Sequence, residues 1–155
     1  MPRNNLLKTL REAYPAFRFV PGKEFRWSAR SATIYYNSTE ENAASLLHEL
    51  AHALLGHTQY ETDIDRLQME SSAWHYAQHT LAPKFGITIT DDEKEDALDT
   101  YRDWLHRRSL CDSCNVPGIQ VKTDTYQCLN CRCQWEVAAH NRRRNSARSN
   151  ATAAA

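Results

Sequence analysis

The sequence lacks any apolar run long enough to cross a bilayer, and its 155 residues carry no net formal charge at pH 7. Without such a run the chain is not expected to span a membrane. The N-terminal residues Met1 to Asn5 lead into an amphipathic segment and do not resemble the apolar region of a signal peptide. We therefore expect a cytoplasmic protein without a membrane partner.

Cysteine is absent before Cys111, and all five cysteines of the chain lie in one short stretch. In a cytosolic chain this clustering favours metal binding over disulfides. Cys111 and Cys114 form one C-x-x-C pair, Cys128 and Cys131 form another, and the residues between the pairs include several β-formers. The pattern is typical of a structural zinc ribbon, in which strands bring two thiolate pairs to one tetrahedral ion. Cys133 is left over, as a bystander or as an alternative to Cys131.

The balanced charge is unevenly distributed, because residues 1–37 and those after 101 are mainly basic whereas residues 38–101 are mainly acidic. A solvated surface is the ordinary explanation. The alternative is a nucleic-acid or acidic-protein partner for the basic ends, to which Arg142-Arg143-Arg144 and Arg148 would add phosphate contacts. Residues 140–155 have no apolar periodicity and are predicted to be disordered.

The chain is long enough for one core of ordinary size and a small appended module. We predict an α+β fold, in which a small antiparallel sheet packs on a zincin-like helical core. The predicted domains are a metallopeptidase-like domain over residues 1–108, a zinc ribbon over 109–139 and a tail over 140–155.

Periodicity and capping signals divide the first domain into elements. A helix is predicted over residues 5–14, and strands over Phe17 to Tyr36, with a turn at Pro21-Gly22. The other predicted elements are a helix capped by Ser38 and Glu41 that stops near Gly56, a helix from about Arg66 to the residue before Pro83, and a helix that opens with the capping box Thr90-Asp91-Asp92-Glu93 and ends at Arg107-Arg108.

The most informative stretch is His48-Glu49-Leu50-Ala51-His52. Two histidines four residues apart on a helix project from the same face, so both imidazoles can reach one metal ion, which the motif predicts to be zinc. Glu49 points beside the ion, where it can accept a proton from a water that the metal activates. Because two histidines and a glutamate would be costly in an Ala- and Leu-rich helix without a role, the motif favours a metal site over an ordinary polar helix.

A catalytic zinc needs a third protein ligand and leaves a fourth position open. The register of a metzincin is absent, because Leu55 and Thr58 occupy its glycine and third-histidine positions. Glu70 ranks first, since it shares a helical face with predicted core residues and a buried carboxylate needs a partner. The alternatives are His57, Asp63, Asp65 and His75; His57, Tyr60 and His75 are also candidates for stabilising an oxyanion.

From about Ala32 to Gly86 the chain resembles the ImmA/IrrE family of metallopeptidases. The resemblance is carried by the strand that ends in Tyr35-Tyr36-Asn37, by the helix from His48 to His57, and by Glu70-Ser71-Ser72-Ala73, with Ala77 and Leu81 after it. It implies that His48, His52 and Glu70 bind zinc and that Glu49 is the base. Family members act in bacteria, phages and mobile elements and often cut a DNA-binding repressor. This chain departs from them in having no helix-turn-helix and in carrying the cysteine ribbon.

These features predict an endopeptidase with two zinc ions, one catalytic and one structural, that cleaves a protein substrate, such as a repressor-type regulator. The alternative is a non-catalytic regulator that binds DNA or protein through the ribbon and the basic tail. Glu49 favours the enzyme, because a scaffold has no need of a base at that position. The ribbon itself either binds substrate or nucleic acid, or only stabilises a small chain.

Overall fold

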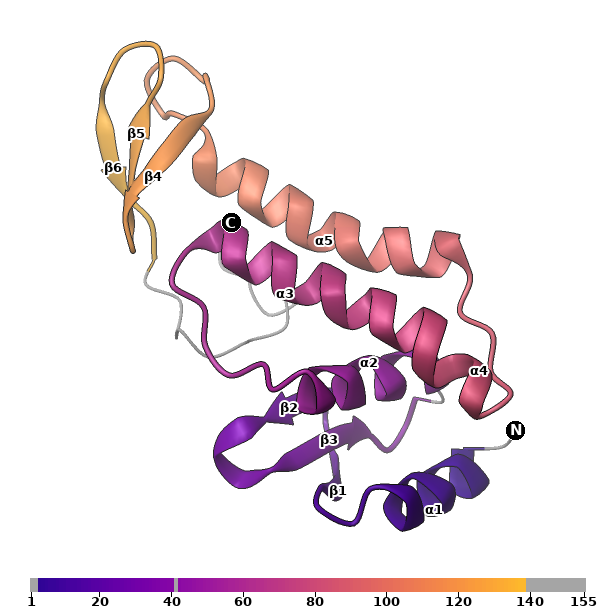
Figure 1. Cartoon of the computed structure of the whole chain (residues 1–155). Coiled ribbons are helices and arrows are strands. Elements are labelled where there is room, and N and C mark those ends of the chain that lie inside the picture. The colour runs from indigo at the N-terminus through magenta and orange to yellow at the C-terminus, as the bar shows by residue number, and fades with distance from the viewer. Residues whose placement is uncertain (1–2, 41, 139–155) are drawn as a thin grey trace. The chain divides into compact units, whose positions relative to one another are not determined.

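The computed structural model describes residues 3–40 and 42–138 and shows an α+β fold with two small sheets (Figure 1). The chain divides into two compact units. Unit 1 contains the residues up to Thr58 together with Met69–Glu95, and unit 2 contains Gln59–Gln68 and the residues from Asp96 onward. The predicted domain boundary at residue 108 falls inside unit 2, and the predicted disordered tail, residues 140–155, lies outside the described residues.

The sheet of unit 1 is mixed, whereas an antiparallel sheet was predicted. It consists of β1 (Arg18–Gly22), β2 (Arg26–Ser28) and β3 (Thr33–Asn37) in the order β1-β3-β2, with β1 parallel and β2 antiparallel to β3. Pro21 and Gly22 do not turn the chain back but continue β1, paired with Tyr36 and Asn37. Because β1 is an edge strand, the missing N–H of Pro21 breaks no ladder inside the sheet.

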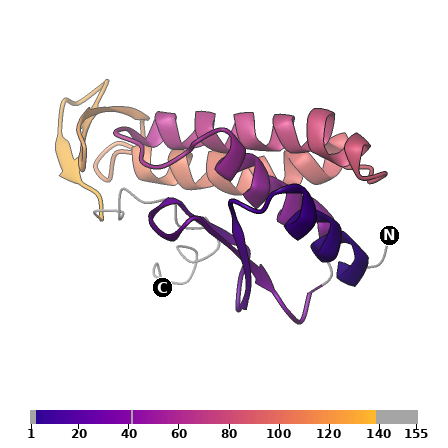
Figure 2. The same cartoon turned by 60° about the horizontal axis from the view of Figure 1, so that its bottom comes forward.

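Helix α2 (Ala43–Leu54) carries the motif and packs on β2 and β3 (Figure 2). The predicted cap at Ser38 is wrong, and its predicted partner Glu41 lies outside the described residues. The helix is capped by Asn42 instead, whose side chain accepts a hydrogen bond of 2.8 Å from the backbone N–H of Ser45. The end of the helix agrees with the prediction, since Gly56 follows it with φ of 68°, in the left-handed region that favours glycine.

Two further helical segments complete unit 1. α1 (Arg3–Ala13) matches the predicted N-terminal helix, and α3 (Asp63–Tyr76) continues through a π-helical segment, Ala77–Leu81, into α4 (Ala82–Lys84). Only the part of α3 from Met69 onward belongs to unit 1. The core of this unit consists of apolar side chains that are at most 1% exposed: Leu6, Leu10, Ile34, Leu46, Leu47, Leu50, Ala51, Ala73, Ala77, Leu81 and Ala82.

α5 (Asp91–Ser109) begins with the predicted capping box. Thr90 N–H and Oγ1 donate to the carboxylate of Glu93 at 2.8 and 2.9 Å, and Glu93 N–H donates to Thr90 Oγ1 at 3.2 Å. A second such box opens α3, where Thr62 and Asp65 exchange bonds of 2.9 and 3.1 Å, so the helix begins three residues before the predicted Arg66.

The second sheet, in unit 2, is the predicted ribbon. Its strands β4 (Gly118–Lys122), β5 (Thr125–Cys128) and β6 (Gln134–Glu136) are antiparallel in that order. Gly118 is required where β4 meets its neighbours, because an added Cβ would lie 2.5 Å from both the Gln127 carbonyl oxygen and the Trp135 ring. Across the described ranges, 3–40 and 42–138, no helix combines the length and the apolar character that crossing a membrane would need.

Candidate metal centres

The first candidate centre lies between α2 and the part of α3 in unit 1. The Nε2 atoms of His48 and His52 are 3.1 Å apart, and Oε2 of Glu70 lies 3.0 Å from the first and 3.3 Å from the second. All three residues are buried, with at most 4% of their surface exposed. The structure therefore brings together the three residues that the sequence singled out as ligands.

These distances suit one bound ion. Bonds of about 2.0–2.2 Å from a tetrahedral zinc to nitrogen or oxygen place the donor atoms roughly 3.3 Å apart. The three measured separations, 3.0 to 3.3 Å, are close to that value. Two buried imidazoles and one buried carboxylate also form a donor set that zinc prefers. Three protein ligands leave one tetrahedral position for water or substrate.

The sequence builds this centre by placing polar groups on apolar helix faces. Glu70 shares its face of α3 with the buried residues Ala73 and Trp74, as predicted. Trp74 stacks on His48 with ring centroids 4.3 Å apart and an interplanar angle of 17°. The stacking orients the His48 ring, whose buried Nδ1 has no hydrogen-bond partner in the part of the chain that the structure describes.

Glu49 is 3% exposed and lies outside the group of three ligand atoms. Its Oε2 accepts a hydrogen bond of 2.6 Å from the backbone N–H of Trp27 in β2. Since β2 is an edge strand and Trp27 carries an N–H that faces away from β3, the strand can hold the carboxylate without losing a bond of the sheet. The arrangement fixes a buried carboxylate that is not one of the three converging donors, on the residue next to His48 in the chain.

His57 is placed next to His52 by the turn that ends α2. The N–H groups of Gly56 and His57 donate to the carbonyls of Ala53 and His52 at 3.2 and 3.0 Å, which is a Schellman motif. Nδ1 of His57 consequently lies 2.8 Å from Nδ1 of His52, on the side of the ring away from Glu70. His57 is thus a neighbour of a ligand and is not one of the three converging donors.

The other residues that the sequence offered as third ligand or oxyanion donor are elsewhere. Asp63, Asp65 and Tyr60 belong to unit 2, where Asp65 caps α3 and Arg66 lies over the Tyr60 ring at 5.7 Å. His75 is exposed and contacts His79, with ring centroids 4.4 Å apart.

The second candidate centre consists of the four predicted cysteines of the ribbon, Cys111, Cys114, Cys128 and Cys131. The measured Sγ–Sγ distances are 3.4, 3.6 and 3.7 Å. A tetrahedral zinc with Zn–S bonds of about 2.3 Å needs roughly 3.8 Å between sulfurs, whereas a disulfide needs about 2.05 Å. Four sulfurs at this spacing fit one closed metal site.

Both C-x-x-C turns have the same local geometry. The residues that follow them, Asn115 and Arg132, have φ of 59° and 60°, and the turn at Cys128 directs two N–H groups to its sulfur at 3.3 and 3.4 Å. At Cys114, hydrogen bonds from the Val116 backbone and from the side chains of Asn130 and Cys128 lower the pKa of the thiol to about 6. A thiolate at neutral pH is the form that binds metal.

Cys133 is exposed and does not belong to the group of four. Its carbonyl accepts a hydrogen bond of 2.9 Å from the N–H of Cys128, and both its backbone and its side chain form hydrogen bonds with the Cys131 thiol. Of the two roles left open for it, the structure favours the bystander, since Cys131 occupies the fourth position.

A buried polar network that the sequence did not reveal joins the ribbon to the helix ends within unit 2. Asp63, 3% exposed, accepts hydrogen bonds from Arg108 Nε at 2.8 Å and from the Tyr126 hydroxyl at 2.7 Å. Its backbone N–H donates to Gln120 at 2.9 Å, and the Trp135 indole donates to the Arg108 carbonyl at 3.0 Å. Burial and the Asp63 carboxylate raise the pKa of Tyr126, so the phenol remains a donor.

Comparison with known proteins found no match to a protein-family model, to a curated protein sequence or to a solved structure.

Proposed function

We propose that this protein is a zinc-dependent endopeptidase with a catalytic centre at His48, His52 and Glu70 and a structural zinc in the cysteine ribbon. The observation that carries the proposal is the convergence of three buried N and O donors, together with a buried carboxylate on Glu49, the residue that follows His48 in the chain. A site with three protein ligands and a neighbouring base is the arrangement of catalytic zinc, whereas four sulfurs form the closed arrangement of structural zinc. The resemblance to the ImmA/IrrE family supports the same assignment.

When bound, zinc acidifies water and polarises a peptide carbonyl. The residues of the chain supply the rest of the chemistry. The imidazoles of His48 and His52 and the Glu70 carboxylate would hold the ion. Glu49 accepts a proton from water at its carboxylate and later delivers it to the leaving amine. The Trp27 N–H at 2.6 Å fixes the orientation of that carboxylate, so the proton acceptor does not need to reorganise during the reaction.

The proposed substrate is a protein, of the regulatory or repressor type that the resemblance implies. Neither centre by itself determines the sequence that would be cut, so the substrate has to be captured. A full-length Glu49→Gln variant is suited to this purpose, because it loses the base and keeps every ligand.

The test compares wild type, Glu49→Gln and Glu12→Gln, a matched change on the exposed face of α1. Glu49→Gln should bind two zinc ions per chain and lose about 10²–10⁴-fold in peptidase activity, the usual contribution of a general base. Glu12→Gln should match wild type. Proteins retained by immobilised Glu49→Gln are then incubated with wild type, and cleavage is followed by mass spectrometry. Full activity in Glu49→Gln would contradict the proposed mechanism, and an inactive, zinc-loaded wild type would favour the non-catalytic regulator.

A further inference from the structure

The two candidate histidine ligands are held in different ways. His48 is oriented by stacking on Trp74, and its Nδ1 finds no hydrogen-bond partner in the described ranges 3–40 and 42–138. His52, which is fully buried, has Nδ1 2.8 Å from another imidazole nitrogen, that of His57. Ligand histidines commonly donate their second N–H to a carboxylate, a carbonyl or water. Here the imidazole of His57 stands where such an acceptor is usually found.

The protons of this pair have one consistent arrangement when His52 binds a metal. Its Nε2 faces Glu70 and must present a lone pair to the ion, so the proton of the neutral ring is on Nδ1. That N–H can donate only if His57 Nδ1 carries no proton, which places the His57 proton on Nε2.

The same logic extends to helix α3. Nε2 of His57 lies 3.5 Å from Oγ of Ser72, and that hydroxyl donates to the carbonyl of Met69 at 3.0 Å. These hydrogen bonds form a series from His52 through His57 and Ser72 to Met69, in which every polar hydrogen has an acceptor. The series ends one residue before Glu70, so it connects the candidate ligand on α2 to the helix that carries Glu70.

The backbone of His57 is fixed on both sides, which makes the residue a defined support. Its N–H donates to the His52 carbonyl at 3.0 Å, and its own carbonyl accepts from the Trp27 indole at 2.9 Å. Trp27 is 9% exposed, and its ring packs edge-on against Phe17 with centroids 5.5 Å apart. The residue whose N–H holds Glu49 thus also holds the His57 turn.

We propose that His57 is a positioning residue of the metal centre, whose imidazole accepts the Nδ1–H of His52 and thereby fixes the tautomer and ring orientation of that ligand. The inference rests on the proposed metal site. It concerns the affinity and the geometry with which the ion is held. It is tested by measuring metal binding, independently of peptide cleavage.

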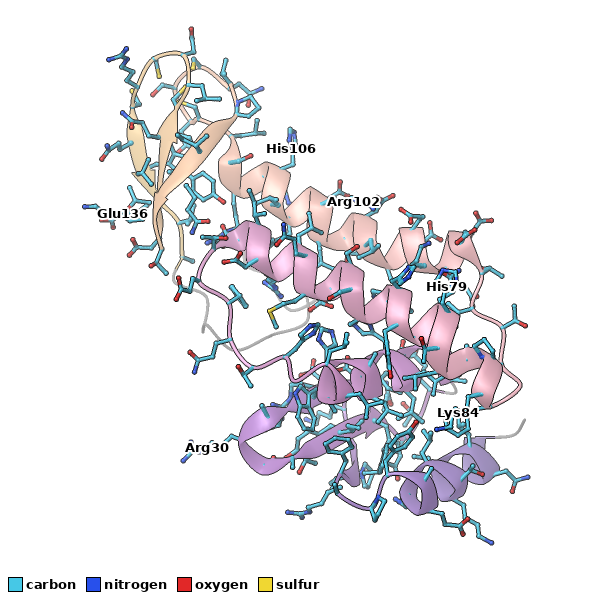
Figure 3. All side chains as sticks on the ribbon, in the orientation of Figure 1. Arg30, His79, Lys84, Arg102, His106 and Glu136 are labelled. Carbon is cyan, nitrogen blue, oxygen red and sulfur yellow. The ribbon has the colours of Figure 1, made fainter. Side chains whose placement is uncertain are left out.

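The test uses the full chain and three variants. His57→Phe keeps an aromatic ring and removes the acceptor, while His57→Asn keeps an acceptor, Oδ1, close to the position of Nδ1. His106→Phe is the matched control, because His106 is exposed and projects away from α5 (Figure 3). Zinc affinity is measured by competition with a chromophoric chelator. The core ion is identified as the one absent from a His48→Ala/His52→Ala variant.

Loss of an outer partner of a metal ligand weakens metal binding by about 10–100-fold. His57→Phe should show a loss of this size at the core site only, His57→Asn should recover most of it, and His106→Phe should bind as wild type does. The visible spectrum of Co²⁺ in the core site should change in His57→Phe and return towards that of wild type in His57→Asn. Unchanged affinity and an unchanged spectrum in His57→Phe would overturn the proposal.

A measurement on wild type keeps the proposal testable if His57→Phe does not fold. Long-range ¹H–¹⁵N spectra of the zinc-loaded protein should show the proton of His57 on Nε2 and that of His52 on Nδ1. A His57 proton on Nδ1 would overturn the inference and leave the proposed function intact. If wild type binds no zinc at the core site, the inference and the proposed function both fail.

Discussion

The two candidate metal centres differ in how the chain assembles them. The ribbon obtains its four sulfurs from two short turns on one hairpin, each with the same local geometry, and donors of its own backbone face the sulfurs. The centre in unit 1 takes two ligands from α2 and one from α3, eighteen or more residues later, and depends on apolar packing to bring them together. The first is a local site that a metal can help to fold, whereas the second is a tertiary site that the fold prepares in advance.

The two candidate centres also differ in the number of donor atoms that they offer to an ion. Four sulfurs saturate a tetrahedral ion and leave no position for a reactant, whereas two nitrogens and one carboxylate leave one. The supporting groups differ accordingly. In unit 1, Trp27 and His57 contact Glu49 and His52, and around the ribbon the supporting groups connect the ribbon strands to Asp63 and Arg108.

The largest expected effect comes from removing the ligands of one centre at a time. His48→Ala/His52→Ala should reduce bound zinc from two ions per chain to one and abolish the proposed cleavage, because one carboxylate cannot hold an ion at this centre. Cys114→Ser/Cys131→Ser should also leave one ion, but should retain cleavage of an unstructured peptide. Elemental analysis of the purified variants, together with a peptide assay, measures both effects.

Cys133→Ser is the control for the second pair, because its side chain lies outside the group of four. It should keep two ions. Two results would contradict the assignment of one ion to each centre. One is that His48→Ala/His52→Ala still binds two ions, and the other is that Cys133→Ser loses the ribbon ion as the paired cysteine variant does.

A smaller effect should follow from the buried network in unit 2. Tyr126→Phe removes the hydroxyl that donates to Asp63 at 2.7 Å and leaves a buried carboxylate with one donor fewer. Hydrogen bonds to charged groups contribute about 1.5–3 kcal/mol, so the free energy of unfolding should fall by about 2 kcal/mol in urea titrations. Tyr36→Phe, in the other unit, is the control and should have little effect. No difference between the two variants would mean that the ribbon contributes little to unit 2.

The smallest predicted effect distinguishes the cap expected from the sequence from the one observed. Asn42→Ala removes the side-chain oxygen that caps α2 and should lower the free energy of unfolding by about 1 kcal/mol. Ser38→Ala changes the residue that the sequence suggested and should lower it by much less. Thermal unfolding of the two variants, followed by circular dichroism, makes the comparison; equal destabilisation would contradict the structural assignment of the cap.

Features that depend on residues near one another in the chain could be predicted from the sequence. The spacing of His48 and His52 places them on one helical face whatever surrounds the helix, and the two C-x-x-C turns and the Thr90 capping box are equally local. Glu70 could be predicted as the third ligand because the apolar periodicity around it indicates burial, and a buried carboxylate needs a partner.

Only the tertiary structure decided the features that join distant segments. Alternating strands do not encode their partners, so the parallel pairing of β1 with β3 could not be read from Pro21-Gly22. Asp63 lies 63 residues from Tyr126, and nothing in either local sequence indicates their hydrogen bond. His57 looked like a competing ligand until the turn after Gly56 placed it behind His52. The physical reason is that spacing fixes directions along one element, whereas contacts between elements are selected by packing of the whole chain.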